Sequence, residues 1–326
     1  MSITFQFDRP TAIRVAQLLE GAGMLKAAVD VWLGVCAGDP YDPDARIKFG
    51  ELFFQHRQAE FPPGTLQRSQ FILQAIGFSL PTPVLVDAYF DNLRQLLRDR
   101  PKRDVPGSVV LGLGTGRCGS TTLTAAFASL PDACATHENP PLVNWEPRED
   151  QLRFHFDRFR FLADYFAVVH DASHSWLTSV ETFFDQFPTG KAIGLFRDAA
   201  ACVPSFMRIK GTGPGSANHW VPPGNGIWAT GPGDPSYPTY ALPAEPITDP
   251  DAVKAGHIAR FVTEYNQALH ALSAKHPDRL LLVATDALND SETAARLREF
   301  LGYPLAVPTA LNRGGTQDSA RLKQKF

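Results

Sequence analysis

The stretch from Ser108 to Leu123 reads SVVLGLGTGRCGSTTL, and it decides the fold that the sequence predicts. It opens with a short apolar run rich in β-branched residues, which is typical of a buried parallel strand. Glycines at positions 112, 114, 116 and 119 follow, and a helical stretch begins after them. A glycine-rich turn between a strand and a helix N-terminus can direct several backbone N–H groups at one anion. The stretch therefore predicts an α/β domain with an anion-binding loop.

The residues beyond this stretch extend the same pattern. Further short apolar runs occupy 133–136, 166–170, 192–196 and 280–284, and helical patterns lie between them. The longest helical pattern covers 249–275 and carries apolar residues at three-to-four spacing. Strands that alternate with helices favour a parallel sheet covered on both faces. We expect a five-stranded parallel sheet of the α/β class over residues 105–326.

The N-terminal third has a different pattern of apolar residues. Residues 10–104 show helical spacing throughout, and glycines interrupt the first pattern at Gly21 and Gly23. This first hairpin resembles one tetratricopeptide-type unit, with Leu18, Gly23, Ala27 and Pro40 near the positions that the repeat prefers. The segment 101–107 reads PKRDVPG and is typical of a linker. We therefore expect an all-α appendage at 1–104, which could bind a protein partner.

The α/β region is interrupted by an insertion at 211–250 that is rich in glycine and proline. Its aromatic residues could form a stacking platform for a sugar or aromatic ligand, or could simply pin the insertion to the core. Both interpretations stay open on sequence alone. The aromatic residues concerned are Trp220, Trp228, Tyr237 and Tyr240.

Composition excludes several classes of function. The 326-residue chain has 31 basic and 34 acidic residues, and this balance does not favour binding to nucleic acid or to an anionic membrane. Its 4 cysteines are widely spaced, and no metal-binding motif is present, so we expect reduced thiols and no metal. The N-terminal residues do not resemble a signal peptide and no apolar run is long enough for a membrane span, so we expect a cytoplasmic location.

The residue types in the loop indicate which class of anion it binds. A nucleoside-triphosphate loop has the pattern GxxxxGK[ST], whereas Ser120 stands here where that lysine would be. Arg117 is the loop's single cation and lies inside it. A kinase or NTPase with a degenerate lysine remains an alternative, as does a non-catalytic nucleotide-binding interaction protein.

The loop GTGRCGSTTL resembles that of the sulfotransferase family, which shares the pattern G-x-x-R/K-x-G-[ST]-T. The resemblance implies a P-loop-like fold and 3′-phosphoadenosine-5′-phosphosulfate (PAPS) as donor, with adenosine 3′,5′-bisphosphate as product. It also implies that Arg117 contacts the transferring group and that the loop hydroxyls bind the 5′-phosphate. The donor-binding loop would comprise Gly114, Thr115, Gly116, Arg117, Cys118, Gly119, Ser120, Thr121 and Thr122.

A second motif of this family follows about eighty residues later. Arg197 directly follows a predicted strand, and Ser205 lies eight residues further on. An Arg and a Ser at this separation bind the donor's 3′-phosphate in the family. The glycine-containing segment at Arg313 and Gly314 resembles one that closes over the same phosphate, although it could equally be a plain tail.

Three residues are candidates for the remaining catalytic roles. Glu138 lies twenty-one residues after Arg117, a spacing similar to that of the catalytic glutamate in protein-tyrosine sulfotransferases. We therefore expect Glu138 to be the general base, with His137 as the alternative. His170 stands where many relatives carry a lysine, and it could supply a cation if protonated. The acceptor itself, whether a small molecule, a carbohydrate or a peptide, is not indicated.

Overall fold

The computed structural model describes residues 8–38, 42–210, 237–238 and 248–307. It divides into two compact units, Met1–Pro101 and Lys102–Phe326.

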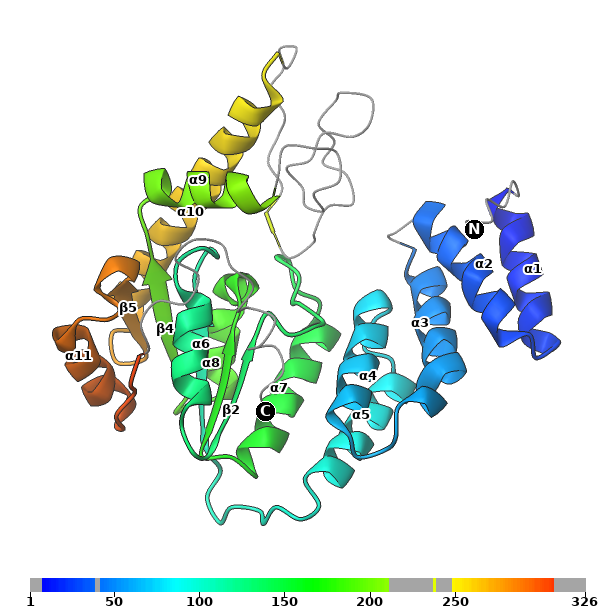
Figure 1. Cartoon of the computed structure of the whole chain (residues 1–326), viewed down its shortest axis with the longest axis horizontal. Helices are drawn as coiled ribbons and strands as arrows, with labels where there is room; N and C mark the ends of the chain where they lie inside the picture. The colour runs from blue at the N-terminus through cyan, green and yellow to red at the C-terminus, as the bar shows by residue number, and fades with distance from the viewer. Residues whose placement is uncertain (1–7, 39–41, 211–236, 239–247, 308–326) are drawn as a thin grey trace. The chain divides into compact units, whose positions relative to one another are not determined.

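The N-terminal unit consists of helices packed in sequence order (Figure 1). Its first two helices bury Ala16, Ala28 and Trp32, and the indole N–H of Trp32 donates to Glu20 Oε1 at 2.6 Å. Leu18, one of the repeat-like residues, is exposed and lies outside this core. The elements are α1 (Arg9–Gly21), α2 (Leu25–Gly38), α3 (Pro43–Arg57), a 3-10 turn (Gln58–Glu60), α4 (Leu66–Phe78) and α5 (Pro83–Leu96).

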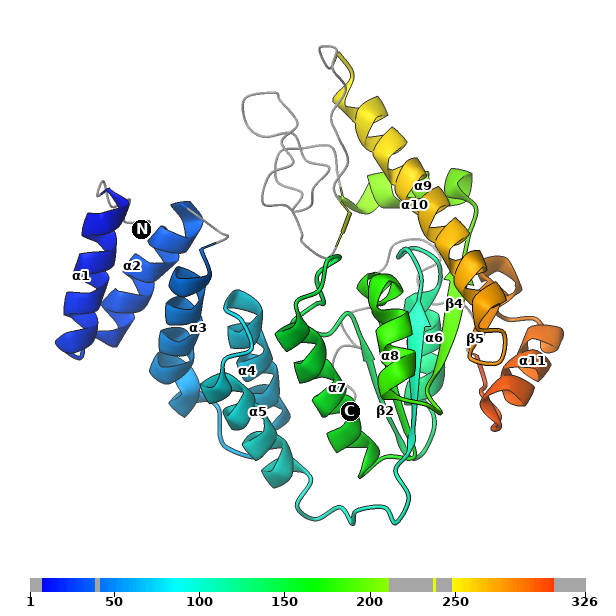
Figure 2. The same ribbon diagram turned by 180° about the vertical axis from the view of Figure 1, so that it is seen from behind.

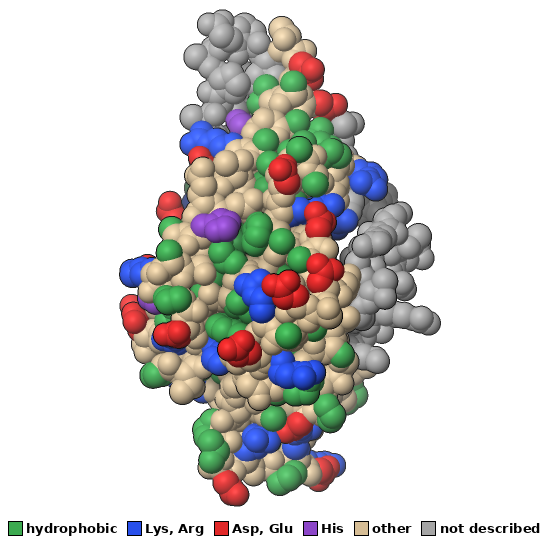
Figure 3. Space-filling model, turned by 90° about the vertical axis from the view of Figure 1, so that its left-hand side faces the viewer, with side chains coloured by type: hydrophobic (Ala, Val, Ile, Leu, Met, Phe, Trp, Pro, Cys, Tyr) green, Lys and Arg blue, Asp and Glu red, His purple; other side chains and the backbone are tan. Residues whose placement is uncertain are grey.

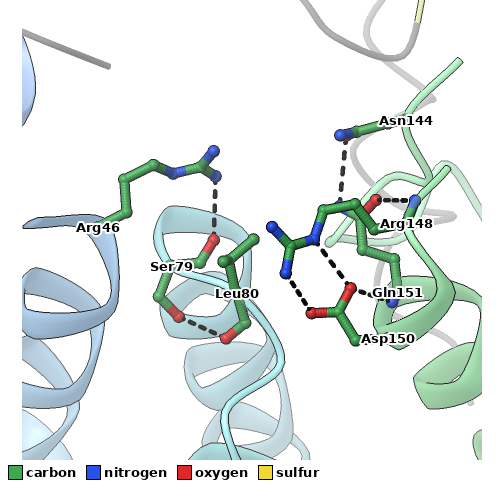
Figure 4. A network of polar contacts seen from close by, with 7 residues as sticks. All are labelled: Arg46, Ser79, Leu80, Asn144, Arg148, Asp150 and Gln151. Atoms are coloured by element: carbon green, nitrogen blue, oxygen red, sulfur yellow. Dashed lines mark hydrogen bonds and ion pairs between the residues drawn. The ribbon is translucent and has the colours of Figure 1, made fainter. Parts of the chain in front are cut away.

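The C-terminal end of α4 is closed by a side chain from α3. The Arg46 guanidinium donates to the carbonyls of Phe78 at 3.1 Å and Ser79 at 3.0 Å (Figure 4). Carbonyls at a helix C-terminus lack N–H donors from within the helix, and a cation near that end is electrostatically favourable. Gly50 allows the close approach of α3, because a Cβ there would overlap the Ser79 side chain.

The C-terminal unit is built on five parallel strands in the order β2-β3-β1-β4-β5. This confirms the α/β class and the five-stranded parallel sheet. Helices cover both faces: α6 lies nearer the viewer in Figure 1 and α8 in Figure 2. The strands are β1 (Ser108–Leu113), β2 (Ala133–His137), β3 (Val168–Ala172), β4 (Lys191–Phe196) and β5 (Leu280–Ala284).

The helices of this unit follow the strands in regular alternation. They are α6 (Ser120–Ala128), α7 (Glu149–Ala163), α8 (Val180–Gln186), α9 (Ala199–Lys210), α10 (Pro250–Lys275) and α11 (Ser291–Leu301), with 3-10 turns η2 (His174–Ser179) and η3 (Thr285–Ala287). At the start of α7, the Gln151 side chain accepts from the Arg148 backbone N–H at 3.4 Å, and Arg148 pairs with Asp150 (Figure 4). A side-chain acceptor of this kind satisfies a backbone N–H group at the helix N-terminus, and an acidic side chain there interacts favourably with the helix dipole.

The third strand differs from the sequence expectation. Its five residues run two positions later than the predicted 166–170, and all five are buried. The predicted run already included His170, and the residues that β3 adds are Asp171 and Ala172. The polar side chains of His170 and Asp171 both find hydrogen-bond partners inside the unit. Hydrophobicity alone could not predict such pairing.

Candidate functional site

The candidate site lies where the direction of the chain's crossovers reverses. From β1 the chain passes to β2 and β3 on one side of the sheet, and from β4 it passes to β5 on the other. In open parallel sheets, the crevice outside the carboxyl ends of two such strands is the usual ligand position. The loop after β1 and the residues after β4 both occupy this position, so the two sequence motifs meet at the carboxyl ends of adjacent strands.

The loop between β1 and α6 has the backbone of an anion cradle. Gly116 and Gly119 have φ angles of 82° and 90°, and Arg117 between them has φ 56°. The left-handed region costs a non-glycine residue about 1–2 kcal/mol, so Arg117 is held there by its surroundings. Gly119 forms the N-cap of α6, which leaves the first N–H groups of that helix without intrahelical acceptors.

Arg117 is tied to both parts of the second motif. Its Nε donates to Ser205 Oγ at 3.0 Å, and Arg197 Nη1 donates to the Arg117 carbonyl at 3.0 Å. The Nε of Arg197 is buried and has no hydrogen-bond partner among the described residues. A guanidinium N–H group without a hydrogen-bond partner can donate to an oxyanion.

A third arginine, which the sequence analysis did not select, belongs to the same cluster. Burial lowers the pKa of Arg117, and the nearby charges of Arg208 and Arg197 lower it further, against the opposing effect of Glu138. Arg208 lies three residues after Ser205, on the same side of α9. Like charges brought together in this way favour the binding of a multiply charged anion.

Groups from the C-terminal elements hold the loop in place. The Tyr265 hydroxyl accepts from the Gly114 backbone N–H at 2.9 Å and donates to the His174 carbonyl at 3.0 Å. Asn266 Nδ2 donates to the Arg197 carbonyl at 2.8 Å, and Thr285 Oγ1 lies 2.8 Å from the Cys118 carbonyl. The sequence analysis missed all three residues. Thr285 could have been found, because it directly follows a predicted strand.

Glu138 stands at the end of β2 in a strained conformation. Its φ is 46°, and its backbone N–H donates to the Ala172 carbonyl at 2.8 Å. The carboxylate lies 3.7 Å from His174 Nδ1, and it is 36% exposed whereas His174 is 2% exposed. Backbone strain of this kind occurs at functional positions, where the surrounding structure maintains it. Glu138 thus combines partial exposure with a fixed position near Arg117, whose pKa it affects.

Tyr237 is the one residue among the four insertion aromatics that the structure describes. It is buried and stacks on the His174 ring at a centroid distance of 4.0 Å. The centroid of its ring also lies 5.4 Å from that of Phe261 on α10. These contacts match the interpretation in which the aromatic residue pins the insertion to the core. Trp220, Trp228 and Tyr240 lie outside the described residues.

His137 points toward the loop rather than away from it. Its Nε2 lies 2.9 Å from Ser120 Oγ, at the first residue of α6. As a result, His137 Nε2 is engaged by a loop hydroxyl, whereas the Glu138 carboxylate is 36% exposed.

His170 does not fit the cationic role expected for it. The side chain is fully buried, with Nδ1 3.0 Å from the Val110 carbonyl and its ring stacked on Phe127 at 4.0 Å. Burial lowers its pKa to about 3, so the ring is neutral at physiological pH. His170 is therefore a core residue, and the extension of β3 explains why it does not end at the site.

The remaining loop residues differ in accessibility. Thr115, Cys118 and Thr122 are buried, whereas Gly116, Arg117, Gly119 and Thr121 are partly exposed. Thr115 Oγ1 donates to the Gly116 carbonyl at 2.8 Å, so its hydroxyl supports the turn. Arg313 and Gly314 lie outside the described residues.

No group of three or more metal-ligating side chains occurs within the part of the chain that the structure describes. Among those same residues, none of the helices combines the length and apolarity needed to cross a bilayer. Acidic and basic side chains are interspersed over the face shown in Figure 3. No family model and no curated protein matches the chain.

Proposed function

We propose that this protein is a PAPS-dependent sulfotransferase with a P-loop-like fold, which transfers a sulfuryl group to an acceptor hydroxyl or amine. The observation that carries the proposal is that Arg117 contacts both Ser205 and Arg197 beyond the carboxyl ends of the adjacent strands β1 and β4. Two motifs about eighty residues apart supply these three residues, in the order and spacing of the sulfotransferase family. The unsatisfied Nε of Arg197 and the charge of Arg208 add capacity for the donor's several negative charges.

Different residues of the site would bind different parts of the donor. The loop amides at the start of α6 and Ser120 hold the 5′-phosphosulfate end, while Arg197 and Ser205 hold the 3′-phosphate. Arg117 stabilises the negative charge that develops on the leaving phosphate oxygen. A guanidinium of fixed orientation suits this role, because its planar donors match the oxyanion geometry.

The transfer itself is an in-line displacement at sulfur. The acceptor oxygen or nitrogen forms a bond to sulfur while the bond from sulfur to the bridging phosphate oxygen breaks. Glu138 takes the acceptor's proton, and adenosine 3′,5′-bisphosphate leaves with the bonding electron pair. The partly exposed carboxylate can reach an acceptor that enters from solvent.

Ligand-induced stabilisation tests the proposal directly. At about 100 times its Kd, a ligand stabilises the folded state by about 2.7 kcal/mol. Adenosine 3′,5′-bisphosphate should therefore raise the Tm by about 5–10 °C, and ATP with magnesium should raise it less. Arg117→Ala should abolish both this shift and sulfuryl transfer from labelled PAPS. Arg298→Ala, which removes an exposed arginine of α11, is the matched control.

Two results would overturn the proposal. Stabilisation by ATP with magnesium but not by the bisphosphate would indicate a kinase or NTPase. Stabilisation by neither nucleotide, together with no transfer to a broad panel of hydroxyl and amine acceptors, would indicate a non-catalytic protein.

A further inference from the structure

The contact between Ser120 and His137 has a consequence for anion binding. A serine hydroxyl carries one proton, so Ser120 can donate one hydrogen bond while its oxygen accepts others. With Ser120 Oγ and His137 Nε2 at 2.9 Å, either atom can be the donor, and the tautomer of the ring decides which. A neutral ring can hold its proton on either nitrogen, whereas protonation of His137 fixes Nε2 as the donor.

The two directions have opposite effects on a bound anion. When Nε2 carries a proton, it donates to Ser120 Oγ, and the serine proton is available to a phosphate oxygen. When Nε2 carries none, the serine proton is used on the ring, and the lone pairs of Oγ face the anion instead. A protonated His137 thus provides one donor more, and its positive charge adds to the attraction.

The surroundings of His137 include groups of both charges. Asp171 on β3 exerts an electrostatic effect on it, and the Asp171 carboxylate oxygens accept hydrogen bonds from Thr136 and from Trp176 Nε1. Burial raises the pKa of the Asp171 carboxyl, and the charges of Arg158 and His137 oppose that rise. The titratable and charged groups on the neighbouring elements are Glu138, Asp171, His170, His174, Arg117 and Arg158.

We propose that His137 is a positioning residue that acts through Ser120, so that binding of the nucleotide's 5′-phosphate group is coupled to uptake of a proton by the imidazole. This inference rests on the proposed function, because it takes the loop's ligand to be the sulfuryl donor or its bisphosphate product. It also assigns His137 a role other than general base, which Glu138 keeps. Donor affinity then falls as the pH rises above the range in which imidazole titrates.

Calorimetry with adenosine 3′,5′-bisphosphate tests the coupling. A rise of about one unit in the pKa of an imidazole with an ordinary value of about 6.5 makes binding about fivefold tighter at pH ~6.5 than at pH ~8.5. Titrations in two buffers of different ionisation enthalpy should show a fraction of a proton taken up by the wild-type protein. His137→Gln keeps an N–H donor for Ser120 but does not titrate, so its affinity should stay high and vary little with pH.

Two further variants separate the coupling from general effects of substitution. Ser120→Ala should bind more weakly and lose the same pH dependence, because the link between ring and ligand is removed. His56→Gln makes the same chemical change at an exposed histidine of α3 and should keep the wild-type profile. Circular dichroism confirms that each variant is folded.

The outcomes distinguish this inference from the proposed function. If wild-type protein binds the bisphosphate but His137→Gln shows the same pH profile and proton uptake, the coupling is wrong and the proposed function stands. If wild-type protein does not bind the bisphosphate at any pH, the proposed function itself is wrong. Parallel loss of the profile in His137→Gln and Ser120→Ala supports the coupling.

Discussion

Replacement of Arg197 by alanine is the sharpest test of the binding site. The substitution removes the hydrogen bond from Nη1 to the carbonyl of Arg117, the loop residue with a left-handed φ; this bond is 3.0 Å long. It also removes the buried Nε, which has no hydrogen-bond partner among the described residues and which the proposed function assigns to the 3′-phosphate. We expect the variant to lose affinity for adenosine 3′,5′-bisphosphate through both effects.

The magnitude follows from the kind of interaction lost. A hydrogen bond from a charged group contributes about 1.5–3 kcal/mol, which corresponds to a weakening of about 10- to 150-fold in Kd. Arg197→Lys keeps a positive charge but cannot reach two acceptors with a planar fork, so we expect an intermediate loss. The same titration with adenosine 5′-monophosphate, which lacks the 3′-phosphate, should show a smaller effect of the alanine substitution.

Isothermal titration calorimetry of wild type, Arg197→Ala, Arg197→Lys and the control Arg298→Ala provides the comparison. A Kd for Arg197→Ala within twofold of the wild-type value would refute the assignment of Arg197 to the nucleotide. An equal loss for both nucleotides would show that Arg197 supports the loop without contacting the 3′-phosphate.

Three further predictions concern catalysis and stability. Glu138→Gln should lower the rate of sulfuryl transfer by about 10²–10⁴-fold while bisphosphate affinity changes little, and an unaltered kcat would exclude Glu138 as the base. Tyr265→Phe leaves the buried Gly114 N–H without its partner, so the free energy of unfolding in urea should fall by about 1–3 kcal/mol; no change would show that the contact is unimportant. Burial lowers the pKa of both His155 and His170 to about 3, so the unfolded state binds more protons between pH 6.5 and 3. Stability should therefore fall as the pH drops through this range, and His170→Asn should reduce the slope by about 1.4 kcal/mol per pH unit; an unchanged slope would contradict a neutral, buried His170.

Much of the fold could be predicted because its signals are local. The alternation of short apolar runs with helical patterns indicated five parallel strands. The linker composition at 101–107 placed the start of the α/β region at 105, and the structure divides the chain between Pro101 and Lys102. The strand ends were less certain. The strand β3 continues past His170 to Ala172. The buried polar atoms of His170 and Asp171 are paired within the fold, and periodicity contains no information about such partners.

The candidate site was predictable in part for the same reason. The glycine spacing around Arg117 indicated a turn and an anion-binding loop without reference to any distant residue. The resemblance to the sulfotransferase family, rather than any physical argument from spacing, supplied Arg197, Ser205 and Glu138 as candidates. The sequence could not show that the Arg117 guanidinium contacts Ser205, since that contact joins residues 88 positions apart.

The sequence by itself determined the class of fold and the loop with its arginine, because each depends on neighbouring residues and on backbone geometry. The candidate base came from the family resemblance alone. The tertiary structure alone decided that Tyr265 and Asn266 hold the loop, that Arg208 joins the cationic cluster, and that His170 is withdrawn into the core. Those outcomes depend on how side chains from distant segments converge at the carboxyl edge of the sheet. Convergence of that kind is a property of packing in three dimensions, so no single stretch of the chain encodes it.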